Sequence, residues 1–336
     1  MHGKILVTGA GGYIGSICLY SLLKKGYEVI AIDNFSTGYK QPLEILQKEF
    51  SSKSLKIYQI NLMDNLDKIF RKETIDTVIH YAASCNVDES VQNPDKYYEN
   101  NVLSTLNLIS TMIKYDVKKI INSSTCAIYG NARYLPVDEN HAVNPGNPYG
   151  VSKRIAEKLI EYHGELKKIR YLIFRYFNVT GASEDGLLGD SKKPSSLLIQ
   201  NAVRSALNIQ PFYVTCSKVD TPDKTPIRDF INVMDLAEAH IKGINYLDDG
   251  GKSEVVNLGT GTGNSVLEII KAVQTVTSAK YNIIYAQKPR LGEYVKMIAS
   301  VNKAKKVLEW MPKRKINDSI TSLLAWYKIH PNGWEY

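Results

Sequence analysis

The chain has 336 residues, of which 44% are hydrophobic and 23% charged, and its formal net charge is +8 at pH 7. This composition is typical of a soluble globular protein with a large core, and no apolar run approaches the roughly 20 residues that span a bilayer. The basic residues are scattered in pairs, whereas a nucleic-acid-binding protein concentrates them on one element among aromatics. We therefore expect neither a membrane nor a nucleic acid as partner, and the mild positive charge suits an anionic ligand such as a nucleotide diphosphate.

The first half of the chain alternates short β-branched runs with amphipathic stretches. We expect strands at residues 5–8, 28–32, 56–60, 77–81, 119–123 and 171–176, and helices between them, among them 14–25, 97–115 and 149–166. Strand and helix alternating at this spacing predict βαβ units, and so an α/β fold with a Rossmann-type, doubly wound parallel sheet.

From about residue 178 the pattern changes to polar, Gly- and Pro-containing stretches with interspersed helices at 195–207, 233–247 and 265–277. We predict a first domain over residues 1–177. Residues 178–336 mainly form a smaller α/β lobe, from which some segments return to the main sheet.

Four cysteines, Cys18, Cys85, Cys126 and Cys216, are widely spaced, with no CxxC pair and no metal-ligand spacing. The apolar run beginning at Ile5 is too short for the core of a signal peptide. We therefore predict a cytoplasmic protein with free thiols and no metal site.

The glycines Gly9, Gly12 and Gly15 follow the first expected strand and open a helix. In that context the spacing predicts a dinucleotide site, because the backbone can approach a pyrophosphate that sits at the helix N-terminus. Asp33 ends the second strand, where a carboxylate accepts bonds from ribose hydroxyls and repels a 2′-phosphate. No Arg or Lys occurs in residues 34–38, so we favour NAD over NADP.

Tyr149 and Lys153 are four residues apart and so share one face of a helix. Such a pair alone is common on surface helices. Here it follows a dinucleotide loop, and a nearby ammonium favours the phenolate of a tyrosine whose ordinary pKa is near 10. Ser123, Ser124 and Thr125 end a strand upstream, where a hydroxyl can hold the substrate oxygen, although each is also a plausible capping residue.

Together with further matching segments along the whole chain, these motifs make the chain resemble the UDP-glucose (UDP-galactose) 4-epimerases of the extended short-chain dehydrogenase/reductase family. The matching segments are residues 8–16, 33–36, 80–83, 100–101, 149–153, 175–178, 228–231, 235–237, 257–261 and 330–334.

The resemblance implies NAD that is regenerated in each turnover, and three catalytic roles. Tyr149 removes the proton from the sugar 4-hydroxyl, Thr125 orients that hydroxyl, and Lys153 binds the nicotinamide ribose and lowers the pKa of Tyr149. It implies cofactor contacts from Gly9, Gly12, Tyr13, Ile14, Gly15, Asp33, Asn34, Ser36, Thr37, Gly38, Asn61, Leu62, Tyr81, Ala82, Ala83, Asn100, Ser123, Tyr149, Lys153 and Tyr176. It implies UDP-sugar contacts from Thr125, Tyr149, Asn178, Ser196, Leu197, Tyr213, Arg228, Arg290, Glu293 and Met297.

Several positions depart from the family pattern. Asn61 replaces an Asp, Ser196 an Asn, Glu293 an Asp, and Cys85 a Lys that can reach the nicotinamide ribose, while the loop over residues 216–224 lacks the usual glycines. Met297 takes a gate position beside the sugar C2 group, and its intermediate, flexible side chain favours plain hexoses with slow use of N-acetyl forms.

Cys126 and Ala127 follow Thr125 and cannot transfer protons, which argues against a 4,6-dehydratase or a decarboxylase. The main alternative is an epimerase or reductase for another nucleotide sugar, such as a UDP-N-acetylhexosamine, UDP-pentose or UDP-uronate. A more distant alternative is a non-catalytic NAD-sensing regulator. By resemblance we also expect a homodimer, formed through residues 97–115 and 149–166.

Overall fold

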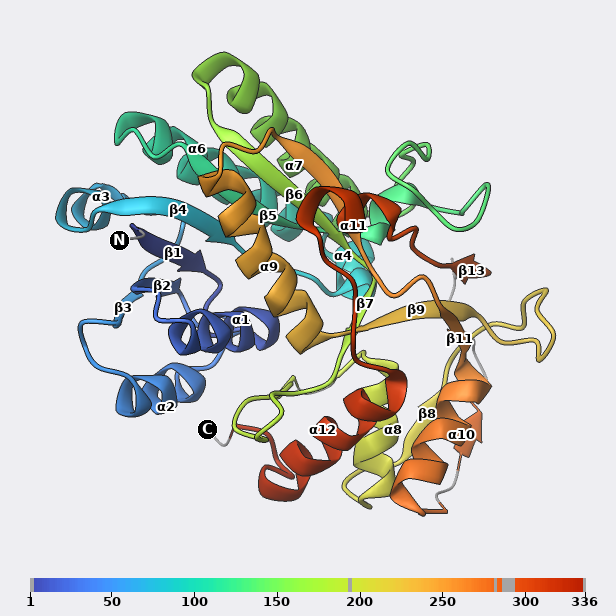
Figure 1. Cartoon of the computed structure of the whole chain (residues 1–336). Helices are drawn as coiled ribbons and strands as arrows, with labels where there is room; N and C mark the ends of the chain where they lie inside the picture. Colours follow the sequence, from blue (N-terminus) through green and yellow to red (C-terminus); the bar gives the residue numbers. More distant parts are fainter. Residues whose placement is uncertain (1–2, 193–194, 281–282, 286–293, 335–336) are drawn as a thin grey trace.

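The computed structural model describes residues 3–192, 195–280, 283–285 and 294–334. Its centre is a seven-stranded sheet in the order β10-β6-β5-β4-β1-β2-β3, with every neighbouring pair parallel (Figure 1). The strands are β1 (Lys4–Thr8), β2 (Val29–Asp33), β3 (Leu55–Gln59), β4 (Ile75–His80), β5 (Lys119–Thr125), β6 (Arg170–Tyr176) and β10 (Glu254–Leu258). The α/β Rossmann-type fold class is therefore confirmed.

Helices cover both faces of this sheet, because side chains on a strand alternate between the faces. On β1, Ile5 and Val7 pack into one core and Leu6 into the other. The first core is completed by α1 (Tyr13–Lys24), α2 (Gln41–Glu49) and α9 (Val233–Asp248). The second is completed by α3 (Asp67–Lys72), α6 (Ser104–Lys114) and α7 (Pro148–Lys167).

The later part of the chain forms a smaller assembly, in which α8 (Leu198–Ala206), α10 (Val266–Thr277) and α12 (Ile316–Ile329) pack together (Figure 1). A small sheet joins β7 (Asn178–Thr180), β9 (Ile227–Asn232), β11 (Gly263–Ser265) and β13 (Lys296–Met297). A two-stranded sheet pairs β8 (Phe212–Val214) with β12 (Ile283–Tyr285). The helix α11 (Asn302–Leu308) contacts α9 and β10.

Two elements differ from the sequence expectations. The helix expected over residues 97–115 is three consecutive pieces, α5 (Pro94–Tyr97), a π-helix (Tyr98–Leu103) and α6. It begins earlier because a proline is favourable in the first turn of a helix. β10 was not predicted as a strand, but it pairs with β6 at the edge of the main sheet. β10 and α9 are thus late segments that return to the main sheet and its first core.

The domain boundary at residue 177 stays a prediction. Among the described residues, no helix is both long and apolar enough to cross a membrane.

Candidate active site

A tight loop of glycines joins β1 to α1 at the carboxyl edge of the sheet. Gly9 has a φ of +68°, and a Cβ there would lie 2.6 Å from the backbone nitrogen of Ala82. A Cβ on Gly15 would lie 2.1 Å from the carbonyl oxygen of Gly9. The helix α1 begins after Gly12 with no side-chain cap and no acidic residue in its first turn. Its positive end is therefore available to a phosphate.

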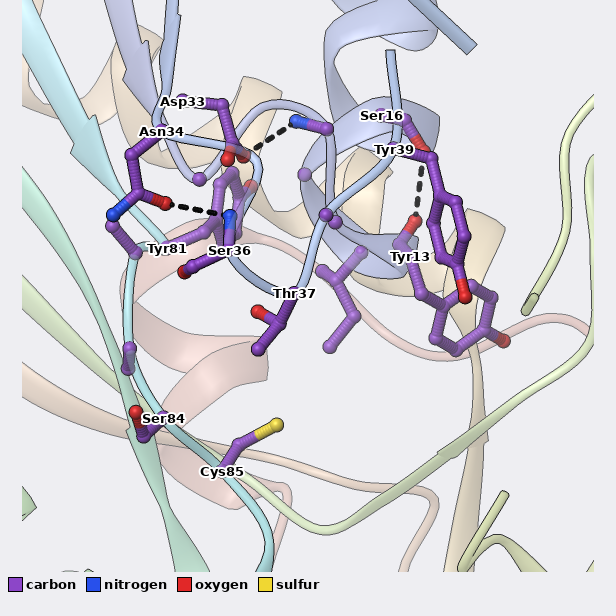
Figure 2. A pocket seen from close by; sticks show the side chains of 18 of the residues that line it. Tyr13, Ser16, Asp33, Asn34, Ser36, Thr37, Tyr39, Tyr81, Ser84 and Cys85 are labelled. Carbon is purple, nitrogen blue, oxygen red and sulfur yellow. Dashed lines mark hydrogen bonds between the residues drawn. The ribbon is translucent and has the colours of Figure 1, made fainter. Parts of the chain in front are cut away.

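Asp33 closes this loop from the end of β2, as Figure 2 shows. Its carboxylate accepts hydrogen bonds from the backbone N–H of Gly11 at 2.8 Å and of Phe35 at 2.7 Å. Burial raises the pKa of Asp33, and these backbone bonds oppose the shift. An oxygen that accepts one N–H retains a lone pair, so Asp33 can still accept bonds from a ribose hydroxyl.

The glycine loop and Asp33 line a cleft that holds about 1070 Å³ of empty space, part of it open to solvent. The predicted cofactor residues that line it are Gly9, Gly12, Tyr13, Ile14, Gly15, Asp33, Asn34, Ser36, Thr37, Gly38, Asn61, Leu62, Tyr81, Ala82, Ala83 and Asn100. Four other predicted cofactor residues, Ser123, Tyr149, Lys153 and Tyr176, are not among the lining residues.

The wall formed by β4 is held by buried polar side chains. His80 bridges Thr8 at 2.8 Å and Thr105 at 3.0 Å, so it links β1 and β4 to α6. Burial, with a smaller contribution from the charge of Lys153, lowers the pKa of His80 to about 3. The imidazole is therefore neutral at physiological pH and supports the cleft as a hydrogen-bonding bridge.

The π-helix connects the cleft to α7 through Asn101. The Asn101 side chain accepts from the Ser84 N–H at 2.7 Å and donates to the Ser84 carbonyl and to the Ser152 hydroxyl, both at 3.0 Å. Ser152 lies between the two predicted catalytic residues of α7. The wall of the cleft and α7 are thus fixed to each other by one buried amide.

Thr125 and Tyr149 come together at the carboxyl end of β5. Thr125 is the last residue of that strand and is 8% exposed. Tyr149 lies in the first turn of α7, which Asn147 caps by accepting from the Gly150 N–H. The ring of Tyr149 packs edge-on against Tyr97, with centroids 6.4 Å apart.

The protonation of this pair is governed by burial. Burial raises the pKa of Tyr149, and its hydrogen bond with Thr125 only partly opposes that shift. Lys153, one turn along α7, is 3% exposed, and burial lowers its pKa to about 8. The protein groups alone therefore keep Tyr149 protonated, which differs from the lowered pKa expected from Lys153.

Glu157 lies one further turn along α7 and anchors the helix. It accepts two hydrogen bonds from the Arg175 guanidinium, at 3.0 and 2.8 Å, and one from the Ser124 hydroxyl. Arg175 also donates to the Tyr129 hydroxyl at 3.0 Å. Burial alone would raise the pKa of Glu157, but these hydrogen bonds hold it below its ordinary value. The network joins α7 to β5 and β6 directly behind Thr125.

The predicted substrate residues lie on several elements of the smaller assembly. Asn178 begins β7, Leu197 caps α8 after Ser196, and Arg228 on β9 pairs in register with Met297 on β13. Met297 is buried in a cluster that includes Phe177 and Cys126. Tyr213 on β8 is 56% exposed, and Arg290 and Glu293 lie outside the described residues.

Arg228 and Cys126 are electrostatic neighbours, which brings the β9 guanidinium close to the residue after Thr125. Burial raises the pKa of the Cys126 thiol to about 12, which fits a packing residue rather than a nucleophile. Tyr294 is a further neighbour of both residues. The end of β5 is therefore the meeting point of the Thr125–Tyr149 pair and a cation suited to a diphosphate.

Sequence reasoning missed part of the cleft. The additional lining residues are Gly11, Ser16, Ile32, Tyr39, Ile60, Ser84, Cys85, Ser104, Gly189, Asp190, Ser191, Lys192 and Trp334. Cys85 lies close to the matched segment 80–83, and Trp334 ends the matched segment 330–334. No local pattern marks residues 189–192. Glu157 could have been found from its place four residues after Lys153 on the same helix face.

Comparisons with known proteins identify the family of the chain. Residues 5–259 match the model of the NAD dependent epimerase/dehydratase family. The chain is 38% identical to the UDP-glucose 4-epimerase of Lactobacillus helveticus, over 99% of each chain. It is 37% identical to the UDP-glucose 4-epimerase of Bifidobacterium longum solved with NAD+ and UDP, with a TM-score of 0.92 over 98% of this chain and 100% of that one. It is 36% identical to the UDP-Glc/GlcNAc 4-epimerase of Campylobacter jejuni, with a TM-score of 0.83 over 98% of this chain and 100% of that one.

Proposed function

The chain belongs to the NAD dependent epimerase/dehydratase family, and we propose that Thr125, Tyr149 and Lys153 carry out its reaction on a UDP-hexose. The protein is an epimerase, its cofactor is NAD, and its reaction interconverts UDP-galactose and UDP-glucose. The observation that carries the assignment of residues is the meeting of Thr125 and Tyr149 at the end of β5, with Lys153 buried one turn along α7.

The proposed reaction oxidises the sugar transiently at C4. When bound, NAD would supply the acceptor for the hydride that leaves C4 and the donor for its return. Tyr149 takes the proton of the 4-hydroxyl, and Thr125 holds that oxygen close to the phenol. After the 4-keto sugar has turned over in the site, Tyr149 returns the proton while the hydride returns to the opposite face, so no net oxidation occurs.

Tyr149 must lose a proton for this chemistry, and burial works against that loss. A cation near the phenol is needed to offset burial. Lys153 lies four residues away. Its ammonium group has no hydrogen-bond partner among the described residues of the protein. We assign this ammonium to the nicotinamide ribose, whose hydroxyls it would bind when NAD is present.

The diphosphate of the UDP-sugar is assigned to Arg228 and Arg290. Asn178, Ser196, Leu197, Tyr213 and Glu293 contact the rest of the nucleotide sugar, and Met297 limits the space beside sugar C2. Because Met297 is buried within an apolar cluster, it cannot swing aside without disturbing Phe177 and Cys126. This favours plain hexoses over N-acetyl hexosamines.

The test is to add UDP-galactose to the purified protein without external cofactor and to follow UDP-glucose by proton NMR. Conversion that disappears in Tyr149→Phe supports the proposal. Tyr162→Phe is the matched control, because Tyr162 lies on the same helix and is 61% exposed. Absence of conversion by a wild-type protein that carries NAD would overturn the choice of substrate.

A second candidate is an epimerase for another nucleotide sugar, and the similarity to the Campylobacter jejuni enzyme favours testing N-acetyl sugars first. Initial rates on UDP-glucose and UDP-N-acetylglucosamine separate the two. Equal or higher catalytic efficiency on the N-acetyl pair would reject the role given to Met297. A reductase would instead consume added NADH or NADPH, which absorbance detects.

We also propose a cytoplasmic homodimer that serves galactose and carbohydrate metabolism. Large apolar side chains are exposed along α7 and along the end of the π-helix and α6, at Ile155, Tyr162, Leu166, Leu103 and Leu106. Their spacing places them on one face of each helix, and α6 contacts α7. Two copies that pack these faces together would bury them. Light scattering should report a dimer for wild type and a monomer for Tyr162→Glu combined with Leu166→Glu; an unchanged mass for that variant would reject this interface.

A further inference from the structure

Residues 189–192 form a strap along the cofactor cleft, in a region where no motif predicted a role. All four residues line the cleft together with the glycine loop. Hydrogen bonds from other segments of the chain hold the strap in place. The Asp190 carbonyl oxygen accepts hydrogen bonds from the Trp326 Nε1–H and from the Tyr327 hydroxyl. Ser191 accepts from the Tyr39 hydroxyl at 2.9 Å and from the Trp334 N–H at 2.6 Å.

This anchoring delivers Lys192 into the cleft. Its Nζ donates to the Cys85 Sγ at 2.8 Å, across a sequence separation of 107 residues. Two carboxylates interact electrostatically with this ammonium among the described residues, and both are engaged elsewhere. Asp190 accepts from the Lys192 N–H and the Ser195 hydroxyl, and Glu89 accepts from Lys96 and from the Tyr97 hydroxyl. The ammonium thus has a thiol as its described partner, which leaves it able to bind an anion.

The charge state of Lys192 supports this reading. Burial lowers the pKa of Lys192, but the neighbouring Cys85, Asp190 and Tyr39 outweigh that effect, so the pKa is raised and the side chain is a cation at neutral pH. An ammonium whose carboxylate neighbours are engaged elsewhere can form charge-assisted hydrogen bonds with phosphate oxygens. The dinucleotide that fills this cleft carries two negative charges on its diphosphate.

We propose that Lys192 is a cofactor-binding residue whose ammonium pairs with the diphosphate of NAD. The strap thereby supplies, from a distant segment, a cation beside Cys85, where the sequence comparison led us to expect a lysine. The backbone N–H groups of the glycine loop and of the α1 N-terminus would contact the diphosphate when NAD binds. Lys192 would add an ion pair, the part of the binding that dissolved salt weakens. This inference rests on NAD as the cofactor.

The test measures how fast the purified holoenzyme releases NAD after mixing with an excess of nicotinamide hypoxanthine dinucleotide. We expect release from Lys192→Met and Lys192→Gln to be about 10- to 100-fold faster than from wild type at low salt. Lys192→Arg should stay within about threefold of wild type, because it keeps the charge. Lys40→Met is the matched control, since Lys40 is an exposed lysine that contacts Phe35 and does not line the cleft.

Salt separates an ionic contact from a structural one. Raising NaCl should accelerate release from wild type more than from Lys192→Met, because only the former loses an ion pair. Wild-type release rates in the Met and Gln variants, or the same acceleration in Lys40→Met, would overturn the proposal. So would a slow, salt-independent release from wild type. A wild-type protein purified without NAD, and unable to bind it, would instead reject the cofactor itself.

Discussion

Acid should destabilise this protein through His80 before it affects the carboxylates. The neutral imidazole bridges Thr8 and Thr105 inside the sheet–helix interface, where its side chain is 1% exposed. Its pKa is lowered from 6.5 to about 3, chiefly by burial. Between these two values the unfolded chain binds a proton and the folded chain does not, so stability falls as the pH drops below 6.5.

The magnitude follows from the size of that shift. Each pH unit below 6.5 costs about 1.4 kcal/mol until the folded-state pKa is reached. His80 alone should therefore lower the free energy of unfolding by about 2 kcal/mol between pH 8 and pH 5, and by about 4 kcal/mol near pH 3. His240, whose pKa burial lowers to about 4, should add a similar amount at pH 5.

Urea unfolding at pH 8 and pH 5 with saturating NAD measures this loss in wild type, His80→Gln and His240→Gln. Each variant starts with some destabilisation from lost packing, so the informative quantity is the change between the two pH values. We expect each single variant to lose about 2 kcal/mol less than wild type over this interval, and the double variant about 4 kcal/mol less. An identical pH loss in wild type and His80→Gln would refute a neutral, buried His80.

Three further predictions concern the site. Gly15→Ala should abolish NAD retention and cost at least about 2 kcal/mol of stability, because the added Cβ would lie 2.1 Å from the Gly9 carbonyl oxygen. Cofactor content and thermal unfolding measure these two effects. A variant that retains its cofactor would contradict the prediction. Glu157→Gln should destabilise the protein by about 3 kcal/mol, because it leaves Arg175 buried without its carboxylate. Glu161 pairs with Lys158 at the surface, so Glu161→Gln should cost under about 1 kcal/mol. Equal losses in urea unfolding would contradict the anchoring role. NAD release from wild type should accelerate as the pH rises above about 8, because Lys153 loses its charge there in the protein without cofactor. Release from Lys153→Met should not respond to pH. A parallel pH response in both proteins would reject the assigned ribose contact.

The sequence predicted those parts of the site that depend on local backbone geometry. Gly9, Gly12 and Gly15 mark a tight turn in which a side chain at Gly9 or Gly15 would clash with backbone, and Asp33 follows from the end of the next strand. Tyr149 and Lys153 follow from helix periodicity. Each of these signals lies within a single strand, turn or helix, so the residues alone determine which side chains share a face.

The rest depends on long-range packing, which a linear pattern does not contain. β10 has the length and composition of many short apolar runs, and only its register against β6 makes it part of the main sheet. Lys192 lies in a polar stretch, and its position in the cleft depends on Trp326, Tyr327 and Trp334 from the end of the chain. The same holds for the pKa of Tyr149, because burial by several segments outweighs the effect expected from one neighbouring lysine.

The distribution of rigidity suits an enzyme whose sugar must turn over while its cofactor stays in place. The helix α7, which carries the proposed catalytic residues, is fixed at three levels, by the Asn147 cap, by Asn101 through Ser152, and by the buried Glu157–Arg175 pair. The proposed substrate contacts come from short strands and helix ends, with Tyr213 largely exposed. Hydride return to the opposite face requires the same Tyr149 and the same cofactor position for both half-reactions, and only the sugar to move. Loosening α7 should therefore reduce turnover more than it changes KM, and Glu157→Gln provides that comparison directly.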